Sequence, residues 1–107
     1  MAGPEKTFEN KVKAYIRAIG GYVVKYHGNA YSTNGTPDLL CCIGGHFVAL
    51  EIKAENGHPT RLQEWTVRQI RQAGGISMIL YPKDWEKTKR FLKALANNTT
   101  LGGNTWE

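Results

Sequence analysis

The fold is decided by residues 38–53, which read DLLCCIGGHFVALEIK. Two apolar stretches flank Gly44 and Gly45, and this pair favours a tight hairpin because glycine readily adopts positive φ. We therefore predict strands over residues 38–43 and 46–53. Both alternating sets of side chains in these strands are apolar, so we expect helices on both faces of the sheet that contains them.

The predicted hairpin brings three charged residues together. If the two glycines form the loop, Ile43 pairs with His46, and the antiparallel register that follows places Asp38 opposite Glu51. Lys53 lies two residues beyond Glu51 on the same strand, so the three side chains share one face of the sheet. Two carboxylates held as cross-strand neighbours destabilise a sheet unless positive charge lies between them. A divalent cation meets that need.

The other elements complete a single α/β domain in the order αβββαβα, with a mixed central sheet flanked by helices. They are predicted from hydrophobic periodicity and from turn residues. Their positions are a helix over 4–19, a strand over 22–27, a polar loop over 28–35, a helix over 60–73, a strand over 76–81, and a helix that begins at Asp84 and runs through Leu95.

Size and composition restrict the class of protein. The 107 residues suffice for one compact domain, and the net charge of +5 favours a polyanionic partner such as nucleic acid. No apolar run approaches the roughly 20 residues of a membrane helix, and residues 1–6 lack the apolar core of a secretory signal. We therefore expect a cytoplasmic protein, in a bacterial or phage-infected cell, with no membrane partner. Cys41 and Cys42 are expected as reduced thiols.

Two carboxylates and a lysine suit the hydrolysis of a phosphodiester. The reaction needs a hard cation that polarises the phosphate and lowers the pKa of a bound water, and a positive group that offsets the developing charge. Mg²⁺ or Mn²⁺ bound to Asp38 and Glu51 would be the hard cation, and Lys53 would be the positive group. A purely structural alternative leaves Glu51 inside an apolar strand without a partner, which costs stability. No phosphate-binding loop is present, so we expect no nucleotide cofactor.

The same residues resemble a known nuclease superfamily. GTPD at 35–38, followed after twelve residues by EIK at 51–53, looks like the proline-aspartate and glutamate-x-lysine core of the PD-(D/E)XK nucleases. The predicted order of elements also resembles that of the family's common core. The resemblance spans about residues 5–95 and implies a restriction-endonuclease-like fold. Beyond Asn97 the sequence is polar, so we expect residues 97–107 to form a flexible tail of the single domain.

Two branches of the superfamily are similar to this chain. The segment TPDLL and the pair Thr60 and Gln63 resemble the virus-type replication-repair nuclease (VRR-NUC) domain. The first predicted helix with residues 20–25 resembles the archaeal-type Holliday junction resolvases. In the VRR-NUC family a glutamine at the position of Gln63 belongs to the active site. The structural alternative is that Gln63 occupies the third helical position of a capping box that Thr60 opens.

The resemblance also implies roles for individual residues. It makes Asp38 and Glu51 metal ligands, with the backbone carbonyl of Ile52 as a third, and Glu9 an inner or outer ligand. It makes Lys53 the group that orients the attacking water. Glu5 lies one turn before Glu9 on the same helix face and stays an alternative.

The function implied is that of a Mg²⁺- or Mn²⁺-dependent endonuclease from a phage or mobile element, acting on branched DNA such as four-way junctions or flaps. A domain of this size has no separate sequence-reading module, so recognition by DNA shape is expected. Symmetric cleavage of a junction needs two active sites, which predicts a homodimer. The alternatives are a non-catalytic nucleic-acid binding module on the same fold and a restriction-type or nicking nuclease.

Five residues are candidates for DNA contact. Tyrosines can stack on unpaired bases and cations can bind phosphates, although a packed tyrosine or a dimer contact is an equal alternative. They are Lys25, Tyr26 and Tyr31 around the polar loop, and Arg61 and Arg68 on one stripe of the second predicted helix.

Overall fold

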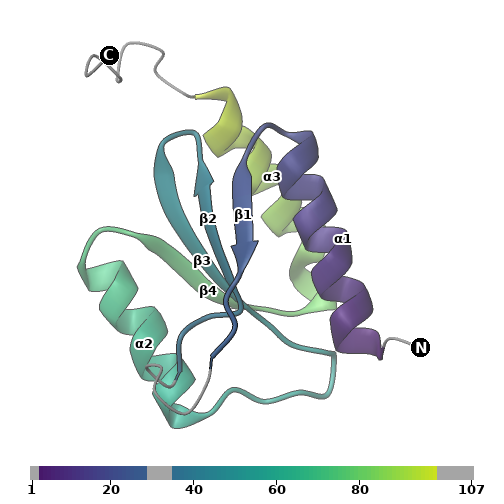
Figure 1. The fold of residues 1–107 in the computed structure, drawn as a ribbon, viewed down its shortest axis with the longest axis vertical. Helices are drawn as coiled ribbons and strands as arrows, with labels where there is room; N and C mark the ends of the chain where they lie inside the picture. The colour runs from purple at the N-terminus through teal and green to yellow at the C-terminus, as the bar shows by residue number, and fades with distance from the viewer. Residues whose placement is uncertain (1–2, 29–34, 99–107) are drawn as a thin grey trace.

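The computed structural model describes residues 3–28 and 35–98 (Figure 1). It contains one sheet with the strand order β1-β2-β3-β4. Strand β2 is antiparallel to both β1 and β3, and β4 runs parallel to β3, so the sheet is mixed as predicted. The strands are β1 (Tyr22–Lys25), β2 (Leu39–Ile43), β3 (His46–Ile52) and β4 (Ile76–Leu80). The helices are α1 (Pro4–Ala18), α2 (Arg61–Gln72), the short 3₁₀ helix η1 (Pro82–Asp84) and α3 (Trp85–Asn97).

The central hairpin has the predicted register. Ile43 pairs with His46, and the ladder continues to Leu39 opposite Leu50. Gly44 and Gly45 both have positive φ, at 58° and 83°, as a tight turn between two strands requires. The next position along this ladder would place Asp38 opposite Glu51.

The hydrophobic core lies between one face of the sheet and the helices α1 and α3, which Figure 1 shows on the same side. Helix α1 buries Phe8, Val12 and Ile16, which recur every four residues along one face of the helix. They meet strand residues such as Leu39 and Leu50, both fully buried. No helix among the described residues is long and apolar enough to cross a membrane.

Helices lie on both faces of the sheet, as predicted, but the second face is only half covered. Helix α2 contacts β4 and β3, where Ala49 and Ser77 are buried. Over β1 and the start of β3 the same face is open, and Tyr22 and Phe47 are 68% and 48% exposed. One helix about 10 Å wide covers about two strands spaced about 4.8 Å apart. Within residues 3–28 and 35–98, no second helix lies over the other two strands on this face.

Smaller differences concern the ends of elements. Strand β1 ends at Lys25, two residues earlier than predicted. Asp84 precedes α3 as predicted, but its side chain caps no backbone N–H, and its Oδ1 lies 3.6 Å from Nζ of Lys87. Most of the predicted polar loop and of the tail after Asn97 lies outside the described residues.

Candidate active site

The predicted site residues gather at one end of the sheet. Because β1, β2 and β3 are antiparallel in turn, the end of β1, the start of β2 and the end of β3 lie together. Lys25 closes β1, and Asp38 directly precedes β2. Glu51 is the penultimate residue of β3, and Lys53 directly follows this strand, which ends one residue earlier than predicted. Gln63 enters from the first turn of α2.

Glu51 is the most deeply buried carboxylate facing α2, with 3% of its surface exposed. Its Oε2 accepts a hydrogen bond from Gln63 Nε2 at 3.1 Å and lies 3.4 Å from Lys53 Nζ. Its Oε1 is buried and has no hydrogen-bond partner among the described residues. An unpaired buried carboxylate oxygen costs free energy, which a bound cation would recover.

The pKa of Glu51 reflects this environment. Burial, and next the charge of Asp38, raise the pKa from its ordinary value of 4.5 to about 7, although Lys53 opposes the shift. Without further positive charge, Glu51 is therefore protonated in a large fraction of molecules at neutral pH. A divalent cation between the two carboxylates would favour the ionised form.

Asp38 is held by the backbone around it. Its Oδ2 accepts the N–H of Ile52 at 2.9 Å, and its carbonyl accepts the N–H of Tyr26 at 2.7 Å. In an unbroken ladder Ile52 would exchange two hydrogen bonds with residue 37, which is a buried proline without an N–H. The carboxylate of Asp38 thus takes the Ile52 N–H, and Pro37 offers no donor to the Ile52 carbonyl.

Glu9 reaches the site from α1 and is surrounded by lysines. Lys25 Nζ lies 2.7 Å from Glu9 Oε1 and 3.2 Å from Asp38 Oδ1, so one ammonium group contacts both carboxylates. Lys6 and Lys13 approach Glu9 Oε2 at 2.9 and 3.6 Å. The pairs of Glu9 with Lys6 and Lys13 have helical i,i+3 and i,i+4 spacing, a signal present in the sequence that our prediction did not use.

Burial separates Glu9 from its rival Glu5. Glu9 is 3% exposed, whereas Glu5 is exposed. Burial alone would raise the pKa of Glu9, but hydrogen bonds from Lys25 and Lys6 outweigh it and leave that pKa below its ordinary value. Burial would lower the pKa of Lys25, yet its bond to Glu9 and the nearby Asp38 raise it. The structure thus places Glu9, and not Glu5, next to the site.

Gln63 forms the predicted capping box and also contacts Glu51. Its Oε1 accepts the Thr60 N–H at 2.9 Å, and its own N–H donates to the Thr60 hydroxyl at 3.1 Å, which completes the predicted capping box. Its Nε2 at the same time donates to Glu51. The cap therefore fixes the amide that orients Glu51.

The structure describes four of the five candidate DNA-contact residues. Lys25 is engaged with two carboxylates, Tyr26 is half-buried, and Tyr31 lies outside the described residues. Arg61 and Arg68 are exposed on α2.

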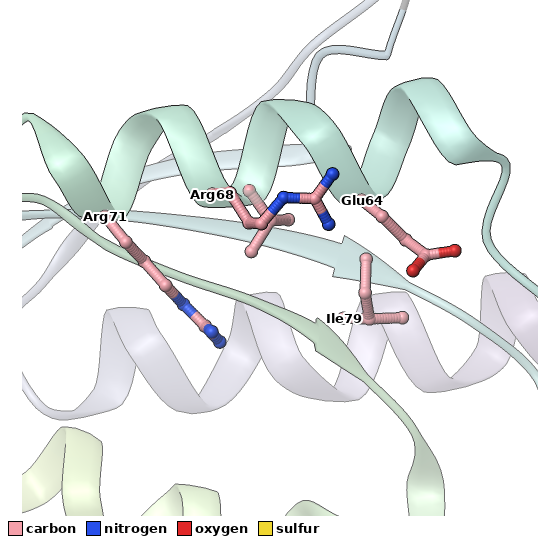
Figure 2. A pocket seen from close by; sticks show the side chains of 5 residues that line it. Glu64, Arg68, Arg71 and Ile79 are labelled. Atoms are coloured by element: carbon pink, nitrogen blue, oxygen red, sulfur yellow. The ribbon is translucent and has the colours of Figure 1, made fainter.

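Arg68 points away from the site, because it lies roughly 140° around α2 from Gln63. Figure 2 shows it beside Arg71, Glu64 and Ile79, in a hollow of about 270 Å³ between α2 and β4. Arg71 there donates from Nε to the carbonyl of Ser77 at 2.8 Å, so it covers part of the outer edge of β4.

The donor set fits one hard divalent cation with few protein ligands. In the part of the chain that the structure describes, no three His, Cys, Asp or Glu side chains are arranged to hold a metal ion. The three carboxylates predicted as ligands thus do not converge, because Lys25 contacts both Glu9 and Asp38. Asp38 and Glu51 remain as a pair. Mg²⁺ commonly binds one or two carboxylates and completes its octahedron with water and phosphate.

No protein-family model matches the chain, and no curated protein sequence matches it. Among solved structures, it is similar to Hjc, a Holliday junction resolvase from the archaeal hyperthermophile Archaeoglobus fulgidus. The TM-score is 0.52 and the sequence identity 21%, over 71% of this chain and 67% of that chain. This likeness confirms the predicted fold class and the resemblance to archaeal-type resolvases at the level of the fold. The resemblance to the VRR-NUC domain is not confirmed.

Proposed function

We propose that this protein is a divalent-metal-dependent endonuclease that hydrolyses phosphodiester bonds in branched DNA. One observation carries the proposal: a buried carboxylate oxygen of Glu51 without a partner, on a side chain that Lys53 and Gln63 hold in place beside Asp38. A structural ion pair between Glu51 and Lys53 would not need a second carboxylate next to it.

Asp38, Glu51 and the carbonyl of Ile52 would hold the Mg²⁺ or Mn²⁺ ion. When bound, that ion polarises the phosphate and lowers the pKa of a bound water. Lys53 orients the attacking water and offsets the negative charge that develops on the phosphate. Gln63 holds Glu51 through Oε2 and leaves Oε1 without a partner among the described residues, so that Oε1 would be available to the ion.

The preference for branched DNA rests on two points. The fold is similar to that of a Holliday junction resolvase, and the chain carries a net charge of +5, which favours a polyanionic partner. We propose that two copies act together, because symmetric cleavage of a four-way junction needs two sites.

The test uses the full chain and labelled four-way junction, flap, duplex and single-stranded DNA, each with Mg²⁺, Mn²⁺ or EDTA. We expect cleavage of the branched substrates with either metal and none in EDTA. Binding without cleavage under every metal condition would contradict the enzyme and favour a non-catalytic binding module. Cleavage in EDTA would contradict the metal mechanism, and equal cleavage of duplex would contradict the preference for branches.

The open face of the sheet is the surface that we propose for the homodimer. Tyr22, Val24 and Phe47 lie on this face and are exposed, and burying such side chains between two copies would stabilise a dimer. Phe47→Asp is expected to weaken self-association at least about tenfold, because it places a charge in an apolar interface. Sedimentation velocity over a concentration series measures the change.

Phe91→Asp is the matched control, since Phe91 is 43% exposed, close to the 48% of Phe47, but lies on α3. We expect it to leave self-association unchanged. A wild-type protein that stays monomeric at all concentrations would contradict the dimer, and an effect of Phe91→Asp alone would move the interface to α3.

A further inference from the structure

Lys25 occupies the space between two carboxylates. Its Nζ lies 2.7 Å from Glu9 Oε1 and 3.2 Å from Asp38 Oδ1, both within hydrogen-bond distance. It reaches this place from the last residue of β1, which pairs with Leu39 next to Asp38. A divalent ion that bridged Glu9 and Asp38 would need the position that this ammonium group holds.

The rest of the cluster leaves little attraction for a second metal ion. The outer oxygen of Glu9, Oε2, is already paired with Lys6 and Lys13. The inner charges are the carboxylates of Glu9, Asp38 and Glu51 against the ammonium groups of Lys25 and Lys53. One divalent ion therefore already makes this cluster positive, and a second ion would bind against that excess charge.

We infer that the site binds a single divalent ion, held by Asp38 and Glu51, and that Lys25 takes the place of a second one. This inference rests on the proposed function. Glu9 then acts as a positioning residue: it holds Lys25, and Lys25 holds Asp38, without contact between Glu9 and the metal. The role differs from the direct or indirect metal ligand that the family resemblance implies for Glu9.

The number of ions bound per chain tests the inference without reference to activity. We expect titration of the full metal-free chain with Mn²⁺, followed by electron paramagnetic resonance and by calorimetry, to give one site in the wild type. Lys25→Met is expected to give two sites, the second between Glu9 and Asp38. The double variant Lys25→Met, Glu9→Gln is expected to return to one site, because the second ion loses a carboxylate.

Lys6→Met is the matched control. It removes the same charge from the same carboxylate, but Lys6 contacts Oε2 and leaves Lys25 in place, so we expect one site. Lys25→Gln is a second neutral replacement if Lys25→Met does not fold, as thermal unfolding would reveal.

The outcomes separate this inference from the proposed function. Two ions per wild-type chain would overturn the inference and leave a metal-dependent nuclease intact. One ion in both neutral Lys25 variants would show that Lys25 does not hold a cation position. No ion in the wild type would overturn the proposed metal site, and the inference with it.

Discussion

Replacement of Lys53 by methionine is expected to slow DNA cleavage by at least about 100-fold, because it removes the group that offsets charge in the transition state. Lys53 Nζ lies 3.4 Å from Glu51 Oε2, and the side chain is half-buried at the end of β3. Methionine keeps most of the side-chain volume and removes only the charge. Single-turnover cleavage of a four-way junction, with Mg²⁺ and excess protein, measures the chemical step apart from binding.

Lys87→Met is the control for the loss of one positive charge from a basic protein. Lys87 is 73% exposed on α3 and pairs only with Asp84 among the described residues. Such surface pairs contribute little, so we expect a rate within about threefold of the wild type. Cleavage by Lys53→Met within about tenfold of the wild-type rate would exclude Lys53 from the reaction, and so would an equal loss in Lys87→Met.

Replacement of Glu51 by glutamine is expected to stabilise the metal-free protein at pH 8 by about 3 kcal/mol. The pKa of Glu51 is raised from 4.5 to about 7 on folding, chiefly by burial. The folded state therefore binds the proton more tightly than the unfolded state does. Protonated Glu51 contributes its full share to the free energy of unfolding below pH 4.5, and this share is lost as pH rises through about 7. At about 1.4 kcal/mol per pKa unit, the rise of the pKa from 4.5 to about 7 corresponds to a loss of about 3 kcal/mol at pH 8. Glutamine cannot ionise, so the Glu51→Gln variant does not lose this stability as pH rises.

Urea unfolding in EDTA at pH 5 and pH 8 measures the effect. Wild type and Glu51→Gln are expected to differ little at pH 5 and most at pH 8. Mg²⁺ is expected to stabilise the wild type at pH 8 and to have little effect on the variant, which has lost a ligand.

Glu9→Gln is a control of opposite sign. Hydrogen bonds from lysines hold the pKa of Glu9 below its ordinary value, so its charged form stabilises the fold at pH 8 and that contribution is lost as pH falls through the folded pKa. We expect this variant to be less stable than the wild type at pH 8. A Glu51→Gln variant less stable than the wild type at pH 8 would show that Glu51 is stabilised in its charged form without metal.

Much of the site was predictable because it rests on one short segment. A hairpin of two strands has a side-chain period of two and a turn marked by adjacent glycines, so the register of Asp38 and Glu51 follows from counting residues. The capping box of Thr60 and Gln63 is local in the same way. These features depend on neighbours in the sequence, and the structure has them as predicted.

The half-open sheet face was not predictable from the strands themselves. Both alternating sets of side chains in β2 and β3 are apolar, which indicates two apolar faces. This pattern does not predict how many helices cover each face. With α1 and α3 on one side, α2 is the only α-helix of the described part of the chain on the other side, and Tyr22 and Phe47 stay exposed.

The sequence by itself thus determined the order of elements, the hairpin, and the placement of Asp38, Glu51 and Lys53 on one face of the sheet. Only the tertiary structure decided that Glu9 rather than Glu5 lies at the site, that Lys25 contacts two carboxylates, and that Glu51 keeps one oxygen without a partner. The physical reason is the range of each effect. Periodicity and turn chemistry act between residues close in the chain, whereas burial and ion pairing depend on segments that meet only when the helices cover the sheet.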